Sequence, residues 1–445
     1  MRKLVFYLHS TNKSFSLEID NNLPAAWERY IELISIFWIV LKEKIEVPLM
    51  ILMDDNIRQK YNEYISKYKE EKPILNRFKS ALDTIENGEY FYTSPKAEYN
   101  AEESVFIGNL IKVYNSETKD EARAKLFEKL LNQQDDIFGD LLKNYDLKVF
   151  DSSKKMNIGE SNRQLRICRF CHNGMNTNIK VKFRKKAHAF SESLGNKAIV
   201  LHEECDICNE KFGSTIENDF IQYLGIFRVF YKVKGKNGIP KIKYKDGGSI
   251  QHIIKENLPK DDLVSKVEGL TVVTAQNIEH NEETGELTVI LESPHKLQEI
   301  NIYKTLCKYV LSVIDDSELQ YLQSSIDWIN SDIIDEEVKL PKIATLLSPE
   351  LYVDAPVLGV YVRKDNDYSI PHIVAEFKFK SLIFVFLLPF STKDENDFIN
   401  PASYEKFWKT FKHYSSIKTW KFQEFSCAKA KKIRFRMKMI QGNKS

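Results

Sequence analysis

The sequence predicts an α+β protein of three parts, with a cysteine-bearing module between two larger domains. Its 445 residues exceed the size of one ordinary domain. Apolar residues recur with helical spacing in some segments and form short strand-like runs in others, which indicates both element types. Hydrophobic residues make up 43% of the chain and charged residues 29%, a composition that excludes global disorder and low-complexity architecture.

The domain boundaries are predicted from changes in composition along the chain. Residues 1–150 are expected to form an N-terminal α/β domain of unknown role, because strand-like and helix-like patterns alternate there without a catalytic signature. The polar, serine-rich stretch 151–162 is expected to be a linker. The cysteine-bearing module then covers 163–248, and a C-terminal α+β domain with a basic tail covers 249–445.

Apolar periodicity also predicts the main elements of the C-terminal domain. Ile302, Leu306, Val310 and Val313 share helical spacing, so one long core helix is expected over 298–330. The strands expected after it cover 357–362, 372–379 and 383–389.

The formal net charge of +2 conceals an uneven distribution of charge. The net charge is −4 over residues 1–150, +9 over 151–250, −13 over 251–400 and +10 over 401–445. Two basic blocks in an otherwise acidic chain indicate polyanion binding at two places.

Four of the six cysteines form two C-x-x-C pairs, Cys168/Cys171 and Cys205/Cys208. Four soft thiolates suit tetrahedral Zn²⁺, and such a closed shell is structural rather than catalytic. Iron–sulfur ligation and four unrelated buried cysteines are the alternatives. We expect no signal peptide and no membrane segment, because no apolar stretch approaches the roughly 20 residues that span a bilayer. A cytoplasmic location follows, in which reduced thiols favour metal binding over disulfides.

Around these pairs, residues 163–225 resemble the HNH endonuclease family, and most closely its bacterial members. The resemblance rests on the two C-x-x-C pairs, on the segment from His188 to Leu194-Gly195-Asn196, and on Cys205-Asp-Ile-Cys208-Asn209 at the start of a helix. It implies a zinc-stabilised ββα-metal module. It also implies hydrolysis of DNA phosphodiester bonds with one divalent cation, Mg²⁺ or Mn²⁺.

The resemblance implies roles for individual residues. His188 matches the general base, which as a neutral imidazole takes a proton from water near pH 7. His188 and Asn209 match ligands of the catalytic cation. The family usually places an acidic residue or a histidine just before the base, whereas this chain has Ala187.

Three residues are candidates for the missing ligand. Glu192 and His202 are preferred, and His202 or Asn196 is expected to orient the base. Glu217 lies about two turns beyond Asn209 on the predicted helix 210–224, too far to share one ion easily.

Basic residues near the module are expected to contact phosphates without recognising bases. These residues are Lys182, Arg184, Lys186, Lys232, Lys234, Lys236 and Lys241. A second pattern, Asp354 with Glu376 and Lys378, loosely resembles another nuclease class. A simple Glu376–Lys378 ion pair is the stronger expectation for it.

The sequence therefore predicts a metal-dependent DNA endonuclease that serves in phage defence or restriction. A sensor or ATPase protein partner and oligomerisation are both compatible with the large flanking domains. The alternative is a non-catalytic, zinc-stabilised nucleic-acid-binding subunit of a larger assembly.

Overall fold

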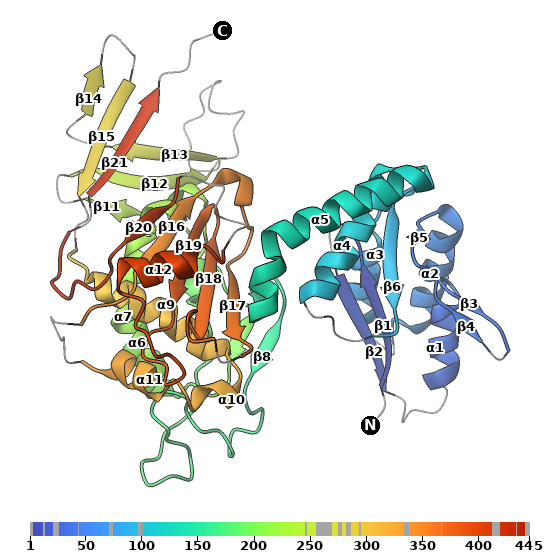
Figure 1. Ribbon diagram of the computed structural model, residues 1–445, viewed down its shortest axis with the longest axis horizontal. Helices are drawn as coiled ribbons and strands as arrows, with labels where there is room; N and C mark the ends of the chain where they lie inside the picture. The colour runs from blue at the N-terminus through green and yellow to red at the C-terminus, as the bar shows by residue number, and fades with distance from the viewer. Residues whose placement is uncertain are drawn as a thin grey trace. The chain divides into compact units, whose positions relative to one another are not determined.

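The computed structural model divides into two compact units, unit 1 over Met1–Lys143 and unit 2 over Asn144–Ser445 (Figure 1). It describes residues 3–11, 14–20, 26–42, 44–70, 74–96, 99, 101–244, 247–254, 269–274, 278–281, 286–292, 295–332, 338–365, 367–411, 419–432 and 434–440.

Unit 1 is a small antiparallel sheet with helices packed against it. Its elements are β1 (Lys3–His9), β2 (Ser14–Asp20), α1 (Ala26–Ile34), β3 (Ile39–Val40), β4 (Ile45–Glu46), β5 (Ile51–Leu52), α2 (Asp55–Tyr68), α3 (Ile74–Leu82), β6 (Tyr90–Ser94), α4 (Ala101–Ser116) and α5 (Asp120–Asn144). The strand order is β2-β1-β6-β5, and every pairing is antiparallel. Unit 1 is therefore α+β, and the α/β arrangement expected for it is wrong, because alternating patterns alone do not fix strand direction.

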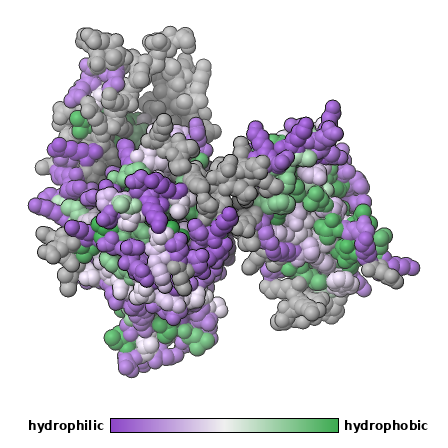
Figure 2. Space-filling view, viewed as in Figure 1, coloured by the Kyte–Doolittle hydropathy of each residue, from purple (hydrophilic) through white to green (hydrophobic). Residues whose placement is uncertain are grey.

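The core of unit 1 is aromatic. The ring centroid of Phe6 on β1 lies 5.0 Å from that of Phe37, in a tilted arrangement, and 5.7 Å from that of Phe78 on α3, in an edge-on arrangement. Figure 2 shows further apolar side chains on the surface near α1 and the β3–β4 hairpin, where Trp27 and Ile39 are more than half exposed. Exposed apolar groups of this size, when they gather, are typical of a contact surface.

Unit 2 contains the cysteine-bearing segment and everything after it. Its elements up to β15 are β7 (Tyr145–Asp151), β8 (Met156–Ile158), β9 (Ala187–His188), the 3-10 helix η1 (Glu192–Leu194), β10 (Ile199–Leu201), α6 (Asp206–Ser214), α7 (Ile216–Tyr223), α8 (Gly225–Phe230), β11 (Ile242–Lys243), β12 (Ser249–Ile254), β13 (Gly269–Thr274), β14 (Ile278–Asn281) and β15 (Glu286–Glu292). The rest are α9 (Glu299–Val313), α10 (Asp316–Leu319), α11 (Gln323–Asn330), β16 (Ile343–Leu347), the 3-10 helix η3 (Pro349–Leu351), β17 (Val357–Arg363), β18 (Ile373–Phe379), β19 (Leu382–Leu387), α12 (Pro401–Trp408), β20 (Lys421–Gln423) and β21 (Arg434–Ile440).

The main sheet of unit 2 is antiparallel, in the order β20-β16-β19-β18-β17-β7. Strands β17, β18 and β19 fall on the three predicted runs, which are apolar because the sheet is buried. The single helix predicted over 298–330 is wrong. The chain adopts extended conformations at Ile314 and Asp315, which separate α9 from α10 and α11.

One hydrophobic core joins the cysteine-bearing segment to this sheet. Phe190 from the loop after β9, Phe220 on α7 and Tyr309 on α9 all contact the ring of Phe377 on β18, at centroid distances of 5.5 to 6.0 Å. Residues 156–158, within the segment predicted as a linker, form β8, which pairs in parallel with β10. The candidate site is therefore built on the same core as the large sheet.

Candidate metal centre and active site

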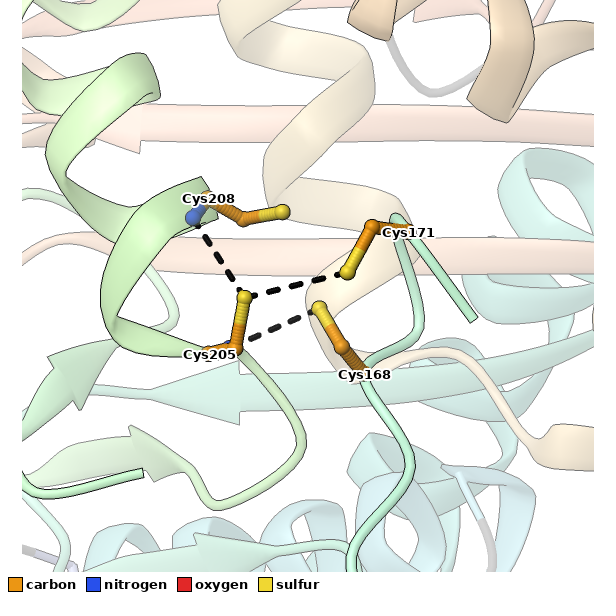
Figure 3. A group of neighbouring side chains, drawn as sticks. All are labelled: Cys168, Cys171, Cys205 and Cys208. Carbon is orange, nitrogen blue, oxygen red and sulfur yellow. Dashed lines mark hydrogen bonds between the residues drawn. The ribbon is translucent and has the colours of Figure 1, made fainter. Parts of the chain in front are cut away.

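Four cysteine sulfurs lie together at the start of α6. The Sγ atoms of Cys168, Cys171, Cys205 and Cys208 all lie within 4.8 Å of one another, and their side chains point toward a common centre (Figure 3). Cys205 caps α6, where its sulfur accepts a hydrogen bond from the backbone N–H of Cys208. Three of the four side chains are buried, and Cys171 is partly exposed.

The spacing of the sulfurs fits a single ion. A Zn–S bond of about 2.3 Å gives a tetrahedron with edges of about 3.8 Å. The Cys171 and Cys205 sulfurs are 3.8 Å apart. An iron–sulfur cluster places iron and sulfide atoms between its thiolates and needs a wider frame. The four cysteines could therefore bind a metal such as zinc.

The first pair sits on a tight turn. The N–H of His172 donates to the carbonyl of Cys168 at 2.9 Å, and His172 adopts a left-handed conformation with φ of 55°. Cys168 in turn donates to the carbonyl of Asn173. These bonds bring both sulfurs of a C-x-x-C pair to one side of the turn, as metal ligation requires.

Arg169, which lies between Cys168 and Cys171 in the sequence, is buried and anchors this turn to α9. Its guanidinium donates to the carbonyls of Leu311 and Ile314 at the end of α9. It also forms ion pairs with Glu203 at 3.0 Å and Asp316 at 2.7 Å. A cation at the C-terminal end of a helix is favourable because the helix dipole is negative there.

Strands β9 and β10 pair antiparallel and lead into α6, so strand, strand and helix follow in that order. The loop between the strands is held by Asn196, whose side chain is fully buried. Its amide donates to the carbonyls of Phe190 and Ile199 and accepts from the N–H groups of Ala198 and Ile199. Gly195, with φ of 98°, ends η1 just before it. The Leu-Gly-Asn motif thus fixes the loop that follows His188.

His188 lies on β9 opposite Val200, and its side chain is 13% exposed. Its Nε2 is 3.9 Å from a carboxylate oxygen of Glu192. The Nδ1 atom is buried and has no hydrogen-bond partner among the described residues. Burial, and next the nearby charge of Lys186, lower the pKa of His188, so the ring is neutral at pH 7.

The other predicted residues lie in different surroundings. Asn209 is in the first turns of α6, where its N–H donates to the Cys205 carbonyl, and no hydrogen bond in the described part of the chain links it to His188. His202 follows β10, and its buried Nδ1 has no hydrogen-bond partner within the described part of the chain. Burial, and next Arg166, lower the pKa of His202. The cation shared by these side chains stays a prediction.

A buried charge cluster beneath His188 was not predicted. The ammonium of Lys308 on α9 is 3.0 Å from Glu204 and 3.0 Å from Glu217. Burial raises the pKa of Glu204 to about 7, because its carboxylate loses water. Attraction to both carboxylates outweighs the burial of Lys308 and raises its pKa, so the ammonium stays charged.

The basic residues predicted to bind phosphate are exposed, namely Lys182, Arg184, Lys186, Lys232, Lys234, Lys236 and Lys241. The second nuclease-like pattern is an ion pair, as expected, since Glu376 and Lys378 are 2.7 Å apart on β18. In the part of the chain that the structure describes, the four cysteines are the only cluster of three or more His, Cys, Asp or Glu side chains close enough to share an ion.

Comparisons of the chain with protein-family models, curated proteins and solved structures gave no match. The site is therefore interpreted from its own residues and geometry. Across the described residues, no helix has both the length and the apolar character needed to cross a bilayer.

Proposed function

We propose that unit 2 is a metal-dependent DNA endonuclease of the HNH type, with zinc in the four-cysteine centre and His188 as general base. One observation carries the proposal. A histidine whose pKa is lowered lies on a strand-strand-helix segment whose helix begins at the cysteine cluster. This arrangement supports the ββα-metal module that the sequence resemblance implies.

The chemistry follows from the residue types. A neutral His188 accepts a proton from the attacking water, and its Nδ1 has no competing hydrogen bond among the described residues. A divalent cation held by His188, Asn209 and Glu192 or His202 would neutralise charge on the phosphorane and the leaving oxygen. Exposed basic residues within the module supply sequence-independent contacts to the DNA backbone.

Plasmid nicking tests this proposal. Wild-type protein is expected to nick supercoiled DNA with Mg²⁺ or Mn²⁺ and not with EDTA. His188→Ala is expected to abolish nicking while DNA binding and zinc content persist. His280→Ala, which changes an exposed side chain on β14, is the control and should nick like wild type. Equal nicking by His188→Ala and wild type would contradict the role of His188.

A non-catalytic nucleic-acid-binding subunit is the second candidate. It is favoured by Ala187, which is buried and offers no ligand before His188, and by the lack of a second metal cluster among the described residues. It predicts DNA binding without cleavage, unaltered by His188→Ala. Cleavage that appears only after addition of a protein encoded by a neighbouring gene would instead indicate an enzyme activated by a partner.

A further inference from the structure

Three charged groups meet in the core beneath His188. Lys308 is 1% exposed, and its ammonium lies 3.0 Å from carboxylate oxygens of both Glu204 and Glu217. Glu204 is fully buried and Glu217 is 10% exposed. The same ammonium donates to the backbone carbonyl of His188 at 3.5 Å. One side chain of α9 therefore contacts the strand of the candidate base, the residue before Cys205, and helix α7.

Glu217 reaches this cluster because the helix breaks. Helix α6 ends at Ser214 and α7 begins at Ile216, with Thr215 between them at φ −114° and ψ −96°. The Glu217 carboxylate lies 3.0 Å from the Lys308 ammonium, which also donates to the backbone carbonyl of His188.

Stability alone does not explain such a cluster. Replacing a buried ion cluster by apolar side chains of similar size is often neutral or stabilising, since burial of the charges costs as much as their attraction returns. The apolar residues around Lys308 on α9 already pack in the core. A buried cluster that contacts the strand of a candidate base is better explained by positioning.

We propose that Lys308 is a positioning residue of the candidate nuclease site. It fixes the His188 strand relative to Glu217, and Glu217 supplies near His188 the carboxylate that Ala187 cannot. This inference rests on the proposed function. It assigns the site a contribution from α9, about a hundred residues after the cysteine pairs.

The test compares Lys308→Met, Lys308→Arg and Glu217→Gln in the plasmid assay over a range of Mg²⁺ concentrations. Partners that support site residues in metal enzymes typically contribute about 10- to 100-fold to activity or metal affinity. Lys308→Met is expected to lower kcat by this factor without changing DNA affinity measured in EDTA. Glu217→Gln is expected to raise the Mg²⁺ concentration for half-maximal rate about tenfold or more.

Two further variants separate positioning from general packing. Lys308→Arg keeps the charge and should recover most of the rate. The double variant of Lys308→Met and Glu217→Gln should be no slower than the slower single variant, because coupled residues are not additive. Lys304→Met is the matched control. Lys304 lies one turn earlier on α9, is also buried, and donates to the carbonyl of Ser331.

The possible results decide the matter. Wild-type rates in both Lys308→Met and Glu217→Gln would overturn the inference, as would an equal loss in Lys304→Met. If Lys308→Met fails to fold, a wild-type rate and wild-type Mg²⁺ dependence in Glu217→Gln would overturn it as well. A wild-type protein that never cleaves would instead overturn the proposed function, and this inference with it.

Discussion

Replacing Cys208 by serine should weaken metal binding and destabilise unit 2. Cys208 is 5% exposed, and its sulfur lies within 4.8 Å of three other cysteine sulfurs. Structural zinc contributes about 10–16 kcal/mol in small zinc domains, so one ligand of four accounts for about 3 kcal/mol. Burying the serine hydroxyl without a hydrogen-bond partner costs a further loss of stability of about 1–3 kcal/mol. The expected total of about 4–6 kcal/mol is a large share of the roughly 5–15 kcal/mol that stabilises a typical domain.

The assay combines metal analysis with urea unfolding of the full chain. Wild-type protein should contain one equivalent of zinc, and Cys208→Ser should contain much less and unfold at lower urea. Two other cysteines give matched controls. Cys307→Ser, buried on α9, should destabilise the protein without changing its zinc content, and Cys427→Ser, exposed, should change neither.

Two results would refute the reasoning. Purified wild-type protein without zinc, or with iron and sulfide instead, would show that the tetrahedral geometry does not select zinc. Full zinc content in Cys208→Ser would show that the metal binds elsewhere.

Three other predictions follow. His372 is buried and its pKa is lowered, chiefly by burial, from 6.5 to about 4. Between pH 6.5 and pH 4 the unfolded chain therefore binds a proton at His372 that the folded chain does not bind. The free energy of unfolding of the wild type should fall by up to about 3 kcal/mol over this window, and that of His372→Gln should not show this loss. Urea unfolding at each pH measures the difference. Replacing Lys182 and Lys234 by alanine should reduce the slope of log K for DNA against log salt by about 2, and an unchanged slope would exclude both from the interface. Phe377→Ala should lower the free energy of unfolding by about 3–5 kcal/mol, and a loss below 1 kcal/mol would contradict the packing of its three aromatic neighbours.

The parts of the fold that the sequence predicts well depend on local chemistry. The C-x-x-C spacing brings two sulfurs to one side of a turn, so the cysteine cluster could be expected from the pattern alone. Long apolar runs such as 383–389 indicate buried strands because every residue must avoid water. The α/β class predicted for unit 1 is wrong, because the pairing of β1 with β6 and of β6 with β5 depends on contacts between distant segments.

The site was predicted only in part, for a similar reason. Gly213 and Thr215 are typical of a helix end and a helix start, and this signal could have revealed the break that redirects Glu217. Lys308 gave no signal of its own. A lysine on an apolar helix is ordinarily exposed, and its burial depends on Glu204 and Glu217, which lie roughly a hundred residues earlier.

Helix α9 is what joins these local features into one site. The end of α9 accepts hydrogen bonds from Arg169, which lies between the first two cysteines. Its middle presents Tyr309, which packs on Phe190 and accepts a hydrogen bond from the N–H of Ser191 in the loop that follows His188. Lys308 contacts the backbone carbonyl of His188 on β9 and the carboxylate of Glu217 on α7. Helix α9 therefore contacts the cysteine turn, the hairpin loop and α7, although it lies outside the segment of HNH resemblance.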